Sequence, residues 1–233
     1  MGGRKLEHIK QNPFVKKVGF NRIVLCCVLL LMYGLFCALT GGSFAGTTRI
    51  MNALNYAYFL GFLSLGVTFV IATGEIDFSI GPVMFCCALI SGYSLTTHGI
   101  AMPVAMILSV AIGLLFGIFN GYLVAYWSVP SFITSMASMN IAKGLASVYT
   151  KTQSVSWPQA TDPVNGWYRN IIKVNGLPVG LIILLLVAVV CAIILNKTKI
   201  GRYILCLGSN KEAVRLSGVD VKKWEMLAFI ICG

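Results

Sequence analysis

Charge is scarce in this sequence, and negative charge is scarcest. Only 11% of the 233 residues are Asp, Glu, Lys or Arg, and just seven residues are acidic, whereas 58% are hydrophobic. A soluble domain of this length needs far more charge on its surface. The scarcity excludes an ordinary soluble protein and predicts an all-α fold, a polytopic integral membrane helical bundle.

The sequence also lacks the motifs of several enzyme classes. No Gly-x-x-x-x-Gly-Lys-Ser/Thr phosphate loop occurs, so the chain has no evident means of binding ATP itself. It has no His-Glu-x-x-His motif and no nucleophile elbow, and its two histidines, His8 and His98, are far apart. The eight cysteines show no Cys-x-x-Cys spacing, which argues against zinc. We therefore expect no catalytic residue, metal or cofactor in this chain.

The basic residues are clustered. Thirteen of the 18 Lys and Arg residues lie in segments 1–22 and 197–223. The formal net charge of +11 could suggest a nucleic-acid partner, but clustering beside apolar runs is the positive-inside pattern of membrane proteins. We therefore expect no nucleic acid, and we place both basic segments, the amino terminus included, in the cytoplasm.

Six apolar runs approach the roughly 20 residues that a spanning helix needs. They are residues 23–40, 52–73, 80–95, 102–127, 132–149 and 178–195. The first is longer than an ordinary signal-peptide core. An even number of crossings returns the chain to its starting side, which agrees with two cytoplasmic basic segments. We predict a cytoplasmic amino terminus at 1–22, a transmembrane region at 23–196, a cytoplasmic loop at 197–224 and the start of a further span at 225–233.

The run 102–127 carries three glycines at intervals of four, Gly113, Gly117 and Gly121. Such glycines line one helix face and allow a second backbone to come close, so we expect them to serve helix packing. Asn120 lies beside this face, where it could bond to a neighbouring helix or line a polar path. The loop 150–177, expected outside, is rich in aromatic residues that suit either the membrane interface or an external partner.

Segment 74–82 holds the only two acidic residues between Glu7 and Asp162, namely Glu75 and Asp77. Carboxylates next to apolar spans normally face water, a partner or the protein interior. Two interpretations stay open: a cytoplasmic turn in which Asp77 or Ser79 caps the next helix, or a hinge beside a translocation path. The residues that we single out are Gly74, Glu75, Asp77, Ser79 and Gly81.

A polar island at residues 197–224 separates two apolar runs. Ser209 with Glu212 three places later forms a capping-box pattern, and Gly218 offers the left-handed conformation that ends a helix. The pattern predicts a helix of about two turns over residues 210–217. So short a helix is marginal in water and should dock against something. Physical chemistry alone leaves open a cationic loop on lipid headgroups and a protein-docking helix.

Three stretches resemble the ribose and galactose type of ABC sugar permease. Glu212-Ala213-Val214 with Gly218 resembles the Glu-Ala-Ala…Gly cytoplasmic loop, and Gly74-Glu75-Ile76-Asp77-Phe78-Ser79-Ile80-Gly81 resembles the signature Gly-Gly-Ile-Asp-Leu-Ser-Val-Gly. Val129-Pro130-Ser131-Phe132-Ile133-Thr134-Ser135, continuing to Thr150, resembles a third family segment, with Lys143 where Arg is usual. The chain departs from the signature at Glu75, Phe78 and Ile80.

The resemblance implies a permease subunit of a bacterial inner-membrane ABC importer for a monosaccharide. Its implied partners are membrane lipid, a second permease subunit of the same or another kind, a separate ATPase that uses ATP, and an extracytoplasmic sugar-binding protein. The ATPase-coupling residues would be Ser209, Asn210, Glu212, Ala213, Arg215, Leu216 and Gly218. The hinge or path residues would be Gly74, Glu75, Asp77, Ser79, Gly81, Asn120, Pro130 and Ser131. Such permeases extend beyond this length, so we expect further spans after Gly233.

Two other functions stay open. A proton-coupled secondary transporter could use Asp77 or Glu75 as its proton carrier. A membrane enzyme could use the same carboxylates as acid, base or metal ligands.

Overall fold

The chain divides into two units, Met1–Ala53 and Leu54–Gly233. The computed structural model describes residues 20–174 and 177–233, so the basic segment 1–19 lies outside the described residues. In the first unit, helix α3 spans Phe20–Leu39 and is followed by a short 3-10 helix, η1, at Ser43–Ala45.

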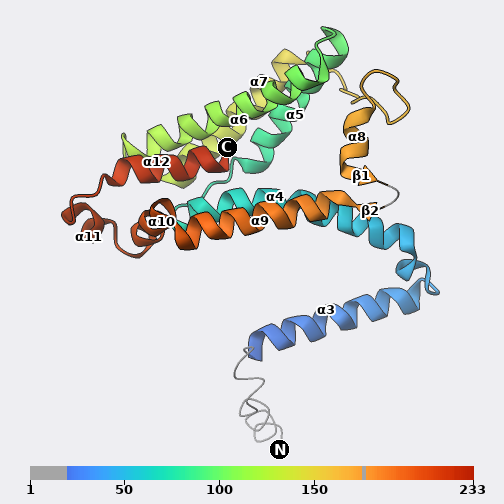
Figure 1. Cartoon of the computed structure of the whole chain (residues 1–233), viewed down its shortest axis with the longest axis horizontal. Coiled ribbons are helices and arrows are strands. Elements are labelled where there is room, and N and C mark those ends of the chain that lie inside the picture. Colours follow the sequence, from blue (N-terminus) through green and yellow to red (C-terminus); the bar gives the residue numbers. More distant parts are fainter. Residues whose placement is uncertain (1–19, 175–176) are drawn as a thin grey trace, which may run out of the picture. The chain divides into compact units, whose positions relative to one another are not determined.

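Helix α4, Thr47–Ala72, begins in the first unit and continues into the second. The remaining elements belong to the second unit (Figure 1): α5 Ile80–Thr97, α6 Met102–Ala125, α7 Ser131–Tyr149, α8 Trp167–Ile172, α9 Val179–Lys197, α10 Lys199–Ser209, α11 Lys211–Leu216 and α12 Val221–Cys232. A two-residue strand pair, β1 Lys173–Val174 with β2 Leu177–Pro178, joins α8 to α9. The predicted all-α, polytopic fold is confirmed.

Each predicted apolar run corresponds to one long helix. The bounds agree within a few residues. The largest difference is at α4, which begins at Thr47, five residues before its predicted run. Among the described helices, α4, α5, α6 and α9 are long and apolar enough to cross a bilayer. Helix α7 is as long as α9 but carries more polar side chains, so the count of six crossings stays a prediction.

The predicted glycine face of α6 lies against α12. A β-carbon added at Gly117 would lie 2.7 Å from the carbonyl oxygen of Phe229, and one added at Gly121 would lie 2.9 Å from that of Met226. A β-carbon added at Gly113 would lie closer still to the carbonyl oxygen of Gly233. The absence of side chains at these three positions is therefore what allows the two backbones to approach.

Two apolar clusters hold the second unit together around this contact. Val83, Cys86 and Phe116 pack with Ala142 and Ala146, which joins α5, α6 and α7. Phe69, Ile204 and Ala228 pack together, which joins α4, α10 and α12, and α9 closes over this cluster through Cys191 and Ile194. Helices α4 and α9 also meet where Gly180 contacts the ring of Tyr58.

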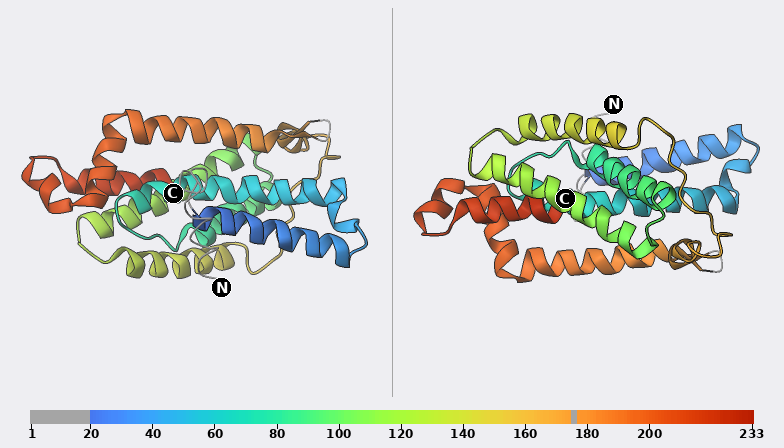
Figure 2. Two further views of the ribbon diagram at one scale, coloured as in Figure 1. Left: turned by 90° about the horizontal axis from the view of Figure 1, so that it is seen from below. Right: turned by 90° about the horizontal axis from the view of Figure 1, so that it is seen from above.

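The elements of the second unit meet at two opposite ends. Figures 1 and 2 show α10, α11 and the start of α12 together at one end, which we call the α11 end. At the other end, the Ser94 hydroxyl lies 2.8 Å from the Tyr149 hydroxyl, and Trp157 and Tyr168 pack on a cluster that contains Met102. The connections from α4 to α5 and from α6 to α7 lie at the α11 end. There, the Ile76 N–H donates to the Ser131 hydroxyl at the start of α7, and Glu75 pairs with Lys211 of α11.

The outward faces of the long helices are apolar. Ile107 and Leu115 on α6 and Leu186 on α9 are 69%, 65% and 63% exposed. Exposed apolar surface on this scale is unfavourable in water and is expected where lipid replaces water. The chain is a multi-pass membrane protein.

Candidate functional site

The segment between α4 and α5 carries half of the predicted hinge or path residues, namely Gly74, Glu75, Asp77 and Ser79. Gly74 ends α4 with a φ of +85°, a backbone conformation that glycine adopts without strain. The backbone of Gly74 packs against that of Gly208 on α10, and a β-carbon on Gly208 would collide with the Ala72 carbonyl oxygen. This close approach brings α10, and with it α11, directly beside segment 74–79.

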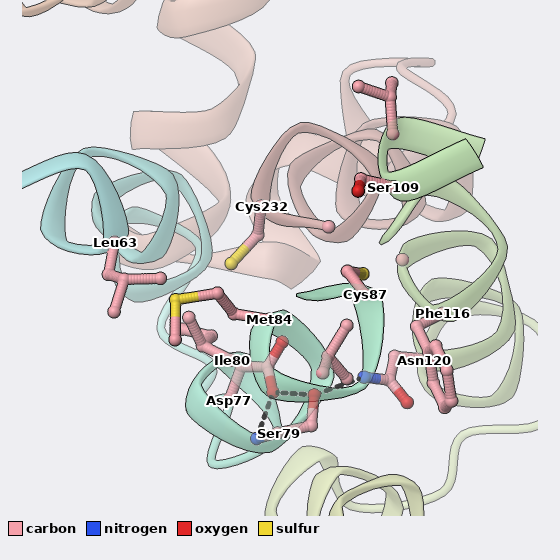
Figure 3. Close-up of a pocket in the computed structure, with 14 residues that line it drawn as sticks. Leu63, Asp77, Ser79, Ile80, Met84, Cys87, Ser109, Phe116, Asn120 and Cys232 are labelled. Carbon is pink, nitrogen blue, oxygen red and sulfur yellow. Dashed lines mark hydrogen bonds between the residues drawn. The ribbon is translucent and has the colours of Figure 1, made fainter. Parts of the chain in front are cut away.

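Asp77 heads a chain of hydrogen bonds that runs between three helices (Figure 3). Its Oδ1 accepts from the backbone N–H of Ser79 at 2.7 Å and from the Ser79 hydroxyl at 2.6 Å. The Asn120 amide on α6 donates to the Ser79 hydroxyl at 2.9 Å, and the Ser138 hydroxyl on α7 donates to the Asn120 carbonyl oxygen. Every donor in the chain points toward the Asp77 carboxylate.

The Ser79 side chain belongs to this hydrogen-bond chain and does not cap α5. Ser79 directly precedes α5, but its side chain makes no capping hydrogen bond to the helix and instead donates to Asp77. Ser79 and Asn120 are 2% and 1% exposed, so their polar groups depend on one another for hydrogen bonds. Of the two predicted capping residues, Ser79 makes no capping hydrogen bond to α5, because its oxygen accepts from the Asn120 amide instead, whereas Asp77 accepts from the Ser79 N–H directly before the helix.

A cavity of about 280 Å³ opens beside Asp77, between α4, α5, α6 and α12. Its polar lining comes from Asp77, Ser79, Asn120 and Ser109, and the rest is mostly apolar. The volume is close to the lower limit of roughly 300 Å³ for small-molecule pockets in proteins. A mostly apolar cavity with one carboxylate and neutral hydrogen-bonding groups suits a small, uncharged, hydroxyl-bearing ligand.

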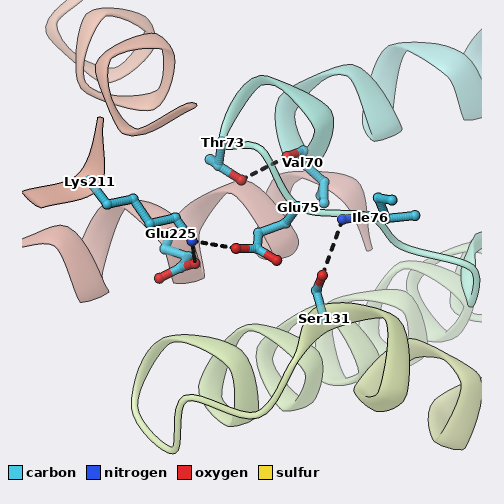
Figure 4. A network of polar contacts seen from close by, with 7 residues as sticks. All are labelled: Val70, Thr73, Glu75, Ile76, Ser131, Lys211 and Glu225. Atoms are coloured by element: carbon cyan, nitrogen blue, oxygen red, sulfur yellow. Dashed lines mark hydrogen bonds and ion pairs between the residues drawn. The ribbon is translucent and has the colours of Figure 1, made fainter. Parts of the chain in front are cut away.

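Glu75, two residues before Asp77, belongs to a separate ionic cluster (Figure 4). Lys211, the first residue of α11, forms ion pairs with Glu75 and with Glu225 of α12, the second at 2.7 Å. The side chains of Glu75 and Glu225 are 18% and 8% exposed. The cluster lines a second cavity, of about 340 Å³, at the α11 end.

The ionic cluster favours the charged forms of Glu75 and Lys211, whereas burial raises the pKa of Glu225. Burial alone raises the pKa of Glu75, but the hydrogen bonds from Lys211 and Ser131 and the Lys211 charge outweigh it, so the pKa of Glu75 lies below its usual value. Burial lowers the pKa of Lys211, but its hydrogen bonds to the two carboxylates raise it more, so the pKa of Lys211 lies above its usual value. Both shifts favour the ion pair at neutral pH.

Ser131 ties the same segment to α7. Its hydroxyl accepts from the backbone N–H of Ile76 at 3.2 Å, and Ser131 is 7% exposed. Pro130, one residue earlier, is exposed and lines the second cavity. Gly81 is exposed with open space around it, so it takes no part in these contacts.

The docking helix is shorter than predicted and is capped differently. Helix α11 spans Lys211–Leu216, and its cap is Asn210, whose side chain accepts from the Ala213 N–H at 3.0 Å. The predicted capping box is wrong: Ser209 is the last residue of α10, and Glu212 pairs with Arg215 at 2.6 Å. The separate helix α10 takes up Ser209 because its apolar face packs on α4 and α12.

The surface of α11 is divided. Val214 is buried, whereas Ala213 is exposed and Leu216 is 80% exposed. Gly218 follows with a φ of +80° and turns the chain toward α12. The outward face of α11 therefore offers apolar groups and the Glu212–Arg215 pair to a partner, while Lys211 and Val214 hold the helix to the protein.

Several residues of these sites were missed by reasoning from the sequence alone. The sequence patterns did not single out Lys211, Glu225, Ser138 or Gly208 for these sites. One signal was available: Glu75 has no cation near it in sequence, so a buried position required a basic partner from elsewhere.

The family model for the permease component of branched-chain amino acid transport systems matches residues 49–233. The chain belongs to this family. The matched region contains both cavities, the ionic cluster and α11, so the sites described above lie within the permease component. Family membership also places the chain among the membrane subunits of transport systems and not among enzymes.

Similar permeases are named for sugars. The chain is 25% identical to the xylose transport system permease protein of Haemophilus influenzae, over 94% of this chain and 74% of the relative. It is 31% identical to the fructose import permease of Bifidobacterium longum, over 76% of this chain and 53% of the relative. It is also 31% identical to the ribose import permease of Haemophilus influenzae, over 82% of this chain and 58% of the relative.

The chain thus spans a little over half the length of the fructose and ribose permeases and about three quarters of the xylose permease. No solved structure matches the chain.

Proposed function

We propose that this protein is the membrane-spanning permease subunit of a bacterial ABC importer that carries a monosaccharide. The observation that carries the proposal is the match to sugar permeases across more than three quarters of the chain. In this proposal the permease lies in the inner membrane with its amino terminus and α11 in the cytoplasm. Two permease subunits, identical or different, form the pathway.

The proposed energy source is a separate ATPase subunit that seats on α11. The exposed Leu216 supports this, because an isolated leucine side chain on a helix at the cytoplasmic end gains from being covered. Helix α11 has only six residues, so its position depends on the Asn210 cap and the buried Val214, while Lys211 connects it to Glu75 and Glu225. A partner that grips Ala213 and Leu216 would therefore move a helix that is fixed to the membrane core.

The proposed substrate path passes the cavity beside Asp77. Its carboxylate and the amide of Asn120 can exchange hydrogen bonds with sugar hydroxyls, and the apolar lining suits the C–H faces of a sugar ring. An extracytoplasmic binding protein would deliver the sugar from the end opposite the α11 end, where Trp157 and Tyr168 lie. ATPase closure would move α11 and switch the path between outward and inward states.

Uptake of labelled xylose, ribose, fructose and leucine into proteoliposomes tests this function. The complete gene product is reconstituted with its ATPase and binding protein, and a matched preparation carries an ATPase disabled in its phosphate loop. We expect uptake of one sugar that requires the intact ATPase and persists with a protonophore. Uptake that survives the disabled ATPase and collapses with the protonophore would identify a proton-coupled transporter instead, and uptake of leucine alone would overturn the substrate class.

A further inference from the structure

The ionic cluster joins three elements that are otherwise distinct. Glu75 lies in the connection between α4 and α5, Lys211 is the first residue of α11, and Glu225 lies on the first half of α12. Lys211 contacts both carboxylates, and all three side chains lie at the wall of the 340 Å³ cavity. The lysine is thus the charged contact between the docking helix and the rest of the second unit.

Glu75 is mechanically close to the proposed path. Only Ile76 separates it from Asp77, so the two α-carbons can be at most about 7 Å apart. Gly74 on one side adopts a left-handed conformation, and Asp77 on the other heads the hydrogen-bond chain through Ser79 and Asn120. A displacement of the Glu75 side chain therefore has to be taken up by the segment that carries Asp77.

The cluster contains two carboxylates and one ammonium group. Without Lys211, two largely buried negative charges would face one another, which favours separation of α12 from segment 74–79. Glu75 also stands where the sugar-permease signature that this segment resembles has its second glycine. The cluster is therefore a property of this chain, and the general family pattern does not require it.

We propose that Lys211, Glu75 and Glu225 form an ionic link that passes the movement of α11 to segment 74–79, so that Lys211 and Glu225 are positioning residues for coupling ATP hydrolysis to transport. The proposal rests on the function proposed above. It assigns the outer face of α11 to gripping the ATPase and the inner face to transmission. Loss of the link should leave the ATPase bound and active while sugar movement fails.

The test measures sugar transported per ATP hydrolysed, with the complete transport complex in proteoliposomes. For Lys211→Met we expect capture of the ATPase and hydrolysis within about twofold of the wild type, and a transport-to-hydrolysis ratio at least about tenfold lower. Lys223→Met is the matched control, since Lys223 is an exposed lysine on α12 whose side chain lies over the Trp224 ring. Its ratio should be unchanged, and Lys211→Arg should restore most of the ratio.

A charge exchange separates transmission from simple destabilisation. The double variant Glu75→Lys with Lys211→Glu again places one cation between two carboxylates, now with the cation on segment 74–79. We expect each single charge reversal to lower the ratio and the double variant to recover it at least in part. Recovery in the double variant supports the link even where a single variant assembles poorly.

The outcomes distinguish the two proposals. If the wild-type complex neither captures an ATPase nor transports sugar, the proposed function fails. If the wild type does both, but Lys211→Met and Glu75→Gln keep the wild-type ratio, or the exchanged pair recovers nothing, the ionic link is wrong and the function stands.

Discussion

At the scale of single residues, Glu75 and Asp77 show how two nearby carboxylates acquire different roles. Both flank Ile76, whose N–H donates to the Ser131 hydroxyl, but each meets a different set of partners. Glu75 meets a cation that α11 supplies, whereas Asp77 receives only neutral donors and opens onto a cavity. The first carboxylate suits a fixed structural link, and the second keeps capacity for a ligand.

The pKa shifts of the ionic cluster predict a pH window for its stabilising effect. The pKa of Glu75 lies below its usual 4.5, so its contribution is present above pH 4.5 and is lost as the pH falls through the lowered value. The pKa of Lys211 lies above its usual 10.5, so its contribution is complete below pH 10.5 and is lost as the pH rises through the raised value.

We therefore expect Glu75→Gln to lower the thermal midpoint of the detergent-solubilised protein by a constant amount between pH 5 and pH 9. The difference from the wild type should shrink as the pH falls through the lowered pKa of Glu75, where the wild-type carboxylate becomes protonated. Differential scanning fluorimetry at stepped pH measures this. A difference that is largest in acid would show that Glu75 is not stabilised as an anion.

The structural role of a residue could be predicted from the sequence only where one residue type determines the local structure. Gly218 was expected to adopt a left-handed conformation, and it does. Partners distant in the sequence could not be found in this way, because Glu75 and Lys211 are brought together by the packing of α10 on α4. The capping residue of α11 was misplaced by one position, because Ser209 and Asn210 are both good caps and tertiary packing chose between them.

At the scale of elements, the close contact of α6 with α12 depends on glycine. The expected role of the three glycines in packing came from their spacing alone. The partner helix could not be named, because the first half of α12 is mostly polar and its apolar run begins only at Met226. The helix in fact starts at Val221, where the Asp220 side chain accepts from the Lys223 N–H. That cap places the polar first turn of α12 beside α11.

Replacing Gly117 by alanine should destabilise this contact. The new β-carbon would lie 2.7 Å from the Phe229 carbonyl oxygen, so the two backbones must separate, at a cost of about 1–3 kcal/mol. Gly144→Ala on α7 is the matched control, because open space surrounds Gly144 and alanine favours a helix by up to about 1 kcal/mol. Thermal unfolding in detergent compares the two, and a Gly117 variant as stable as the Gly144 variant would contradict the close approach.

At the scale of the whole second unit, the proposed docking helix and the proposed sugar path are separate features. The ionic cluster lies beside α11, and the cavity beside Asp77 lies between α4, α5, α6 and α12. Hydropathy was enough to predict the long helices, because their length is set by the bilayer. It could not predict which helices would be neighbours, since apolar faces pack against one another without a sequence code.

Cross-linking at Leu216 tests directly whether a separate ATPase binds α11, as we propose. Leu216→Cys, in a background with Cys206→Ser, is treated with a thiol-to-amine cross-linker in inside-out vesicles that contain the complete transporter, and Leu205→Cys on α10 is the control. We expect a permease–ATPase product at position 216, with a yield that changes when ATP is added, and little product at position 205. If the vesicles take up sugar but position 216 yields no such product, α11 is not the binding site of the ATPase.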